Sequence, residues 1–166
     1  MATIAAVDQS KVLGVTLSND LKWNAHVNSV CKLANRKLFL LLKLRRYGCS
    51  KASLVKFYQA IIRSALTYCF PAICNMPTSL LQSFVRVERR AMKIMSSQPK
   101  QCIGDLCDGL CRGLMKNVVK LEHHPLRCLF DDAGSSYYSL RNRRPLRPPV
   151  ARTERLRNSF VKYASL

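Results

Sequence analysis

The sequence predicts a mainly α-helical protein with a short N-terminal β element, because three patterns follow one another along the chain. The segment "KVLGVTL" (11–17) is β-branched and apolar, and the turn residues "SND" follow it, which predicts one or two short strands or a hairpin. Apolar residues then recur at helical spacing, which predicts a three- to four-helix bundle. The last part is rich in Ser, Pro and Arg and has little apolar periodicity, as in a basic, loosely ordered tail. The expected organisation is a β element at 1–22, a helical domain at 23–100, a further helical segment at 101–133 and the tail at 134–166.

The first expected helix, from Trp23 to Arg46, has an apolar face and a basic face. At roughly 100° per residue, one sector of about 80° holds the expected core residues Val27, Val30, Ala34, Leu38 and Leu41. A second sector of about 80°, on nearly the opposite side, holds Lys32, Arg36, Lys43 and Arg46. Almost no acidic residue balances these cations, which favours a binding role over a merely solvated surface.

Three more helices are expected after the stop signal Gly48. The second is capped by Ser50, and its apolar residues are Leu54, Phe57, Tyr58, Ile61, Ile62 and Ala65. The third is capped by Ser79, and its buried side consists of Leu80, Phe84, Val87, Ala91 and Ile94. Another face of the third helix is basic and carries Arg86, Arg89, Arg90 and Lys93. The fourth runs from about Asp105 to Leu121 and stops before Pro125.

The charge of the chain indicates a polyanionic partner. The formal net charge is +19, from 28 Lys and Arg against 9 Asp and Glu, which makes nucleic acid the first partner to test and an anionic membrane surface the second. No apolar run approaches the roughly 18 residues of a spanning helix. The N-terminal residues lack the pattern of a secretion signal, so we expect an intracellular protein, nuclear or cytoplasmic, with its 8 cysteines reduced.

Catalytic motifs are not evident in the sequence. Polymerases and nucleases of the two-metal kind need clustered carboxylates, and the only adjacent pair is Asp131-Asp132 in "CLFDDAG". This pair superficially resembles the double-Asp box of reverse transcriptases, but Leu129 occupies the aromatic position and no strand clearly follows. A helix end or turn is expected there instead. There is also no P-loop, no glycine-rich dinucleotide motif and no nucleophile motif.

A zinc site is a weaker alternative. Cys107, Cys111, His123 (or His124) and Cys128 approach the spacing of a zinc knuckle. The middle gap is too long for a knuckle and reads as an amphipathic helix, so buried free cysteines on helices explain the set more simply. We therefore expect no cofactor.

Several motifs, taken together and in order, resemble the C-terminal part of the reverse transcriptases of non-LTR, LINE-type retrotransposons. The family pattern "K-[YF]-L-G-[VI]" followed by "D-x-L-x-W-x-x-H" has counterparts in Lys11, Leu13, Gly14, Trp23 and His26. Likewise "FYQAIIRSALTYCFPAI" is similar to "LYxSLVRSxLEYAxxVW", and "FVRVERRAMKIM" to "LExVQRRAxRxI". "HHPLRCLFDD" and "ARTERLRNSF" are similar to segments beyond the polymerase domain. Val12, Thr67 and Glu88 depart from the usual aromatic, Glu and Gln.

The resemblance implies the end of a polymerase palm, a thumb-like helical domain and a post-thumb segment. A thumb holds the duplex of template and primer, so the basic helical faces would bind RNA or DNA backbone without sequence specificity. The fingers, most of the palm and the catalytic carboxylates would belong upstream of Lys11, so this chain alone is not expected to polymerise and its partners could include those missing domains. On this placement Trp23 and His26 anchor the first helix against the strand. The tail residues that would add contacts are Arg141, Arg143 and Arg144.

Two alternatives stay open. The chain could be a stand-alone basic helical module of transposon origin that interacts with RNA or protein. It could also be a zinc-dependent nucleic-acid binder.

Overall fold

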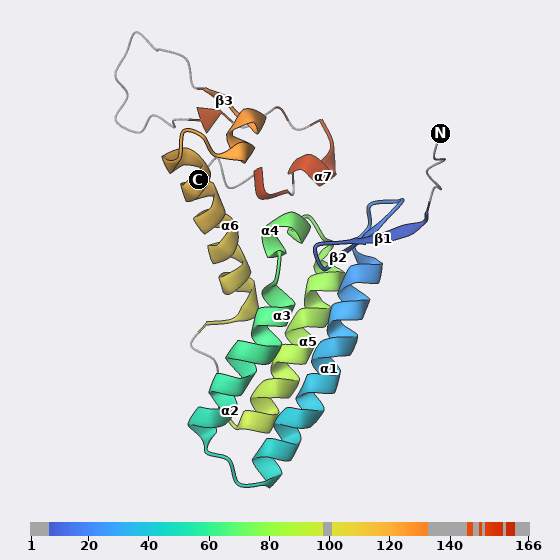
Figure 1. Cartoon of the computed structure of the whole chain (residues 1–166), viewed down its shortest axis with the longest axis vertical. Coiled ribbons are helices and arrows are strands. Elements are labelled where there is room, and N and C mark those ends of the chain that lie inside the picture. The colour runs from blue at the N-terminus through green and yellow to red at the C-terminus, as the bar shows by residue number, and fades with distance from the viewer. Residues whose placement is uncertain are drawn as a thin grey trace. The chain divides into compact units, whose positions relative to one another are not determined.

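The computed structural model describes residues 7–97, 101–132, 146–147, 150, 152–157 and 159–161. It is mainly helical and begins with a two-stranded antiparallel hairpin, as the sequence predicts (Figure 1). The chain divides into two compact units. The first comprises the chain up to Cys69 together with Met76–Asp105, and the second comprises Phe70–Asn75 and the chain from Leu106 onward.

The N-terminal hairpin pairs β1 (Gln9–Val12) with β2 (Val15–Ser18), from Gln9 opposite Ser18 to Val12 opposite Val15. Its two-residue loop is Leu13-Gly14, with φ of 47° and 83°. Positive φ at both loop residues is the geometry of a type I′ turn, which matches the twist of the two strands. All four residues of β1 are exposed, whereas Val15 at the start of β2 is buried.

Helix α1 (Asn24–Arg46) confirms the first expected helix to within one residue. Four of its five expected core residues, Val27, Ala34, Leu38 and Leu41, are buried, and Val30 is half-buried. The helix stops as predicted, because Gly48 has φ of 79° and donates its N–H to the Arg45 carbonyl at 3.1 Å.

The second expected helix is built from three consecutive segments: α2 (Lys51–Phe57), the π-helical turn η1 (Tyr58–Arg63) and α3 (Ser64–Thr67). Ser50 caps it as predicted, since its hydroxyl accepts the Ser53 N–H at 3.2 Å. Ile61 was expected inside but is 39% exposed, while Arg63 is buried. The cause is the π turn, whose hydrogen bonds reach one residue further than those of an α-helix and so change which side chains face inward.

Helix α5 (Thr78–Met95) corresponds to the third expected helix and packs along α1 (Figure 1). Phe84, Val87 and Ala91 are buried as predicted, and Leu80 and Ile94 are half-buried. Ser79 is not the cap, because the helix begins at Thr78, its N-cap position is Pro77, two residues earlier than expected, and no side chain caps it. A proline at that position supplies a fixed backbone angle but no capping oxygen.

The second unit contains α4 (Phe70–Ile73) and most of α6 (Ile103–Lys120), which confirms the fourth expected helix within two residues at its start and one at its end. The 3-10 turn η2 (Pro125–Leu129) follows, and the short helix α7 (Glu154–Arg157) lies nearer the C-terminus. Phe130 and Phe160 meet edge to face, with ring centroids 6.4 Å apart. Most of the predicted tail, 134–166, lies outside the described residues.

The acidic pair does not lie in the turn expected for it. It forms β3 (Asp131–Asp132), which pairs antiparallel with β4 (Leu146–Arg147). A strand partner separated by thirteen intervening residues cannot be recognised from local sequence, because two-residue strands have no periodicity.

Candidate nucleic-acid interface

Helices α1 and α5 are joined by polar contacts as well as by apolar packing. The Arg45 guanidinium donates to the Lys93 carbonyl at 3.0 Å and to the Ile94 carbonyl at 2.6 Å. These carbonyls lie at the C-terminal end of α5, where a cation is favoured by the helix dipole. The Arg90 guanidinium donates to the Asn35 side-chain oxygen at 2.9 Å. These contacts hold α1 and α5 together, so the two helices expose their outer side chains side by side.

All eight basic residues predicted on these two helices are exposed. We call them the α1–α5 basic surface: Lys32, Arg36, Lys43 and Arg46 on α1, and Arg86, Arg89, Arg90 and Lys93 on α5. Burial raises the pKa of the Cys31 thiol on α1, and the nearby charge of Arg86 partly offsets this rise. Together with the Arg90–Asn35 contact, this brings the α5 cations next to α1.

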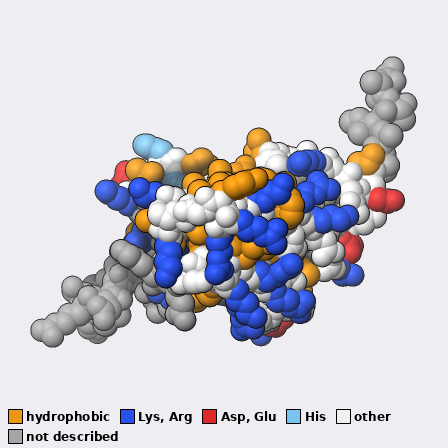
Figure 2. All heavy atoms as spheres, turned by 90° about the horizontal axis from the view of Figure 1, so that it is seen from below, with side chains coloured by type: hydrophobic (Ala, Val, Ile, Leu, Met, Phe, Trp, Pro, Cys, Tyr) orange, Lys and Arg blue, Asp and Glu red, His pale blue; other side chains and the backbone are white. Residues whose placement is uncertain are grey.

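Exposed carboxylates are absent from the helices that carry this surface. Residues 24–97, all of which the structure describes, contain a single acidic residue, Glu88, and it is buried. Figure 2 shows one face of the molecule, on which Lys and Arg side chains lie with hydrophobic side chains between them. The positive potential over α1 and α5 is thus not neutralised from within these helices.

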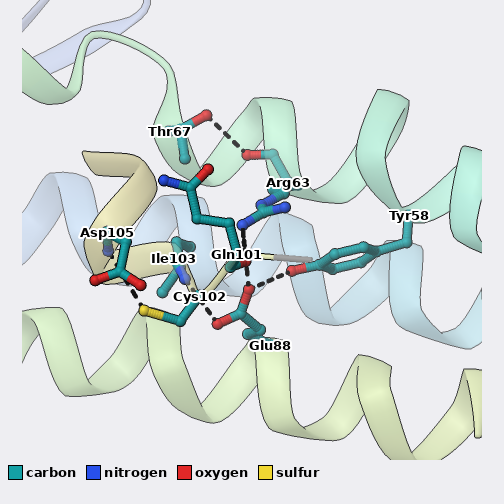
Figure 3. A network of polar contacts seen from close by, with 8 residues as sticks. All are labelled: Tyr58, Arg63, Thr67, Glu88, Gln101, Cys102, Ile103 and Asp105. Carbon is teal, nitrogen blue, oxygen red and sulfur yellow. Dashed lines mark hydrogen bonds and ion pairs between the residues drawn. The ribbon is translucent and has the colours of Figure 1, made fainter. Parts of the chain in front are cut away.

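Glu88 is the centre of a buried polar network (Figure 3). One carboxylate oxygen accepts the Tyr58 hydroxyl at 3.1 Å and lies 3.9 Å from the Arg63 guanidinium, and the other accepts the Ile103 N–H at 3.0 Å. Arg63 also donates to the Gln101 carbonyl. Burial, with the Glu88 charge adding to it, raises the pKa of Tyr58, so the phenol stays protonated and acts as a donor. The network ties α5 to η1 and to the start of α6.

Sequence reasoning missed this network, although part of its signal was available. Glu88 is the only carboxylate in a long basic stretch, and its wheel position lies within roughly 40° of Phe84 on the buried side of its helix. An acid on an apolar face requires a partner inside the protein. The partner Arg63 could not have been identified, because it is turned inward by the π-helical backbone.

Three residues of the first sequence motif lie in the N-terminal hairpin: Lys11, Leu13 and Gly14. Lys11 and Leu13 are exposed, and Leu13 is 85% exposed at the loop. A Cβ atom on Gly14 would lie 3.3 Å from the Tyr68 ring, and the Tyr68 hydroxyl donates to the Leu13 carbonyl at 2.9 Å. This contact joins the turn to the chain just after α3.

The start of α1 is anchored against β2 by His26. This residue is 3% exposed, and its Nδ1 accepts the Thr16 N–H at 3.3 Å. Burial, with Lys11 adding to it, lowers the pKa of His26, which suits a neutral acceptor. Trp23 is half-buried at the N-cap position. The expected anchoring role is therefore visible for His26.

The zinc-knuckle residues lie in different environments. Cys107 and Cys111 are buried on α6, as expected for core cysteines, whereas His123 and Cys128 are exposed. His124 is engaged as the cap of η2, where its Nδ1 accepts the Leu126 N–H at 3.1 Å. Among the residues described, no three His, Cys, Asp or Glu side chains are grouped to hold a metal ion.

The predicted tail cations Arg141, Arg143 and Arg144 lie outside the described residues. In the part of the chain that the structure describes, no helix combines the length and apolarity needed to cross a membrane. Comparisons with protein-family models, with curated proteins and with solved structures give no match.

Proposed function

We propose that this chain corresponds to the end of the palm, the thumb and the post-thumb segment of a LINE-type reverse transcriptase, and that it binds nucleic-acid backbone without polymerising by itself. The observation that carries the proposal is the α1–α5 basic surface. Eight exposed cations occupy two helices packed together, and no exposed carboxylate lies within residues 24–97.

Phosphate binding follows from the charge and from the rigidity of the helix pair. Lys and Arg that contact phosphates release condensed counterions from the nucleic acid, and this supplies most of the affinity of non-specific binding. Such contacts position a duplex without reading its bases. Because Arg45 and Arg90 join α1 to α5, the backbone positions that carry the cations are held relative to one another before binding.

The resemblance to the family is supported by where its motifs meet in space. The Leu13 carbonyl of the first motif accepts the Tyr68 hydroxyl of the second. Tyr58 and Arg63 of the second contact Glu88 of the third. Motifs that are separated in sequence but packed together are expected if each was selected as part of one domain.

The salt dependence of duplex binding tests the proposal. We expect log Kd for a labelled duplex to rise linearly with log salt between about 50 and 200 mM, with a slope that corresponds to several neutralised phosphates. Replacing the α1 cations Lys32, Arg36, Lys43 and Arg46 with Gln should make the slope shallower by up to about 3.6, at about 0.9 per phosphate contact. Circular dichroism should show unchanged helix content.

A matched control removes the same charge elsewhere. Four exposed cations outside α1 and α5 can be replaced with Gln: Lys56, Arg112, Lys116 and Lys120. If this control lowers the slope as much as the α1 variant does, net charge alone drives binding and the assignment to the α1–α5 basic surface fails. A flat salt dependence of the natural chain would refute backbone binding altogether.

A polymerase assay tests the proposal that this chain does not polymerise by itself. Nucleotide incorporation on a primed template with Mg²⁺ or Mn²⁺ should be absent. Robust incorporation that is lost when Asp131 and Asp132 are replaced with Asn would refute this part of the proposal.

A further inference from the structure

An exposed aromatic ring lies within the basic strip of α1. Phe39 is 55% exposed, although burial of a phenylalanine would be favourable. On the continuous α-helix Asn24–Arg46, at roughly 100° per residue, Phe39 falls inside the same sector of about 80° as the four α1 cations. Lys43 Nζ lies over the ring, 5.0 Å from its centroid. The ring is thus flanked by cations and open to solvent.

We propose that Phe39 is a stacking platform for an unpaired base, so that the α1–α5 basic surface binds single-stranded RNA or DNA and not only duplex. This inference rests on the backbone binding proposed above. It adds the substrate class that this surface would accept beyond paired strands.

The chemistry of the strip fits this ligand. Proteins that bind single strands combine a positively charged track for the phosphates with aromatic side chains on which bases stack. The Lys43 ammonium lies over the Phe39 ring and Phe39 still remains exposed to solvent, so a base that stacks on the ring would lie next to this cation. Lys32, Arg36 and Arg46 supply the charge on the same sector.

The ring should distinguish single strands from duplexes. Within a duplex each base is already stacked between its neighbours and paired, so its flat face is not presented to a protein side chain. An unpaired strand offers those faces without this cost. Phe39 should therefore contribute to the affinity for single strands and contribute little to that for duplexes.

The experiment uses the full chain and a conservative substitution. Phe39→Leu removes the aromatic ring and keeps an apolar side chain at an exposed helical position. The matched control is Leu40→Ala, since Leu40 is 50% exposed on the same helix but lies about 100° away from Phe39. Kd is measured by fluorescence anisotropy for a labelled oligothymidylate and for a mixed-sequence duplex of equal length at one salt concentration.

We expect Phe39→Leu to weaken oligothymidylate binding at least about fivefold and to change duplex binding less than about twofold. Leu40→Ala should leave both constants within about twofold. If Phe39→Leu loses affinity equally for both ligands, or loses none for oligothymidylate, the stacking role is overturned. Duplex binding by the natural chain would in that case still uphold the proposed function. If the natural chain binds neither ligand, the proposed function itself fails.

Vesicles that contain phosphatidylserine provide the remaining arm. An apolar insertion into lipid would tolerate leucine in place of phenylalanine. Vesicle binding stronger than oligothymidylate binding, and unchanged in Phe39→Leu, would assign the exposed ring to a membrane surface and overturn the inference.

Discussion

Replacing Glu88 should destabilise the first unit far more than replacing any exposed carboxylate. In Glu88→Ala, the Tyr58 hydroxyl and the Ile103 N–H lose their acceptor, and Arg63, 9% exposed, loses its counter-charge. Removing one member of a buried ion pair costs about 3–5 kcal/mol. Since whole domains are stable by only about 5–15 kcal/mol, this loss would be a large fraction of the total.

Two further variants separate the charge from the hydrogen bonds. Glu88→Gln keeps the shape and one acceptor oxygen but removes the charge, so we expect a smaller loss of about 1–3 kcal/mol. Adding Arg63→Met to Glu88→Ala removes the uncompensated cation, so the double variant should be less destabilised than the sum of the single variants.

The assay is urea unfolding followed by circular dichroism, with Glu122→Ala as the exposed control. The control should change the free energy of unfolding by less than about 0.5 kcal/mol. A loss below about 1 kcal/mol in Glu88→Ala, or additive effects of the Arg63 and Glu88 substitutions, would refute the network as a source of stability.

Three other predictions concern the hairpin, the first helix and the thiols. Gly14→Ala should cost about 1–2 kcal/mol in urea unfolding, because φ is 83° and the new Cβ would lie 3.3 Å from the Tyr68 ring, whereas Gly113→Ala on α6, with nothing within 4 Å, should be neutral or stabilising. Neutral His26 should contribute its full stability above its unfolded pKa of about 6.5, and this contribution should be lost as the pH falls through its lower folded pKa. His26→Gln should make the free energy of unfolding depend less on pH in this range. An equally steep pH dependence in the variant would contradict a buried neutral His26. With a thiol reagent under native conditions, the exposed thiols should react at once: Cys49, Cys102 and Cys128. Cys107 and Cys111 on α6 are buried, so fast reaction of these two thiols would contradict the fold of that helix.

The sequence predicts α1 well because every signal for it is local. The apolar residues recur at helical spacing over the whole length, and Gly48 ends the helix by adopting a positive φ. The hairpin is also local, since Leu13-Gly14 is a two-residue turn between β-branched strands. These elements were predictable without knowing what they pack against.

What could not be predicted depends on contacts between distant segments. Arg63 is buried because Glu88 lies beside it, and the backbone of η1 takes the π form that turns it inward. Among the cations, Arg45 was not distinguished from its exposed neighbours, although it binds the last carbonyls of α5. Composition indicates a basic surface, whereas only the packing tells which cations hold the helices together.

The π turn also bears on how this protein tolerates a change in chain length. Leu54 and Leu66, both buried, are twelve residues apart, and in an uninterrupted α-helix they would point about 120° away from each other. Deleting one residue between them would leave eleven, and in a regular helix the two side chains would then differ by only about 20°. The segment therefore has one residue more than a regular helix needs to keep both leucines inside. Deleting one residue here would convert the π turn to regular α-helix and keep both leucines buried, but it would remove the turn that places Arg63 beside Glu88.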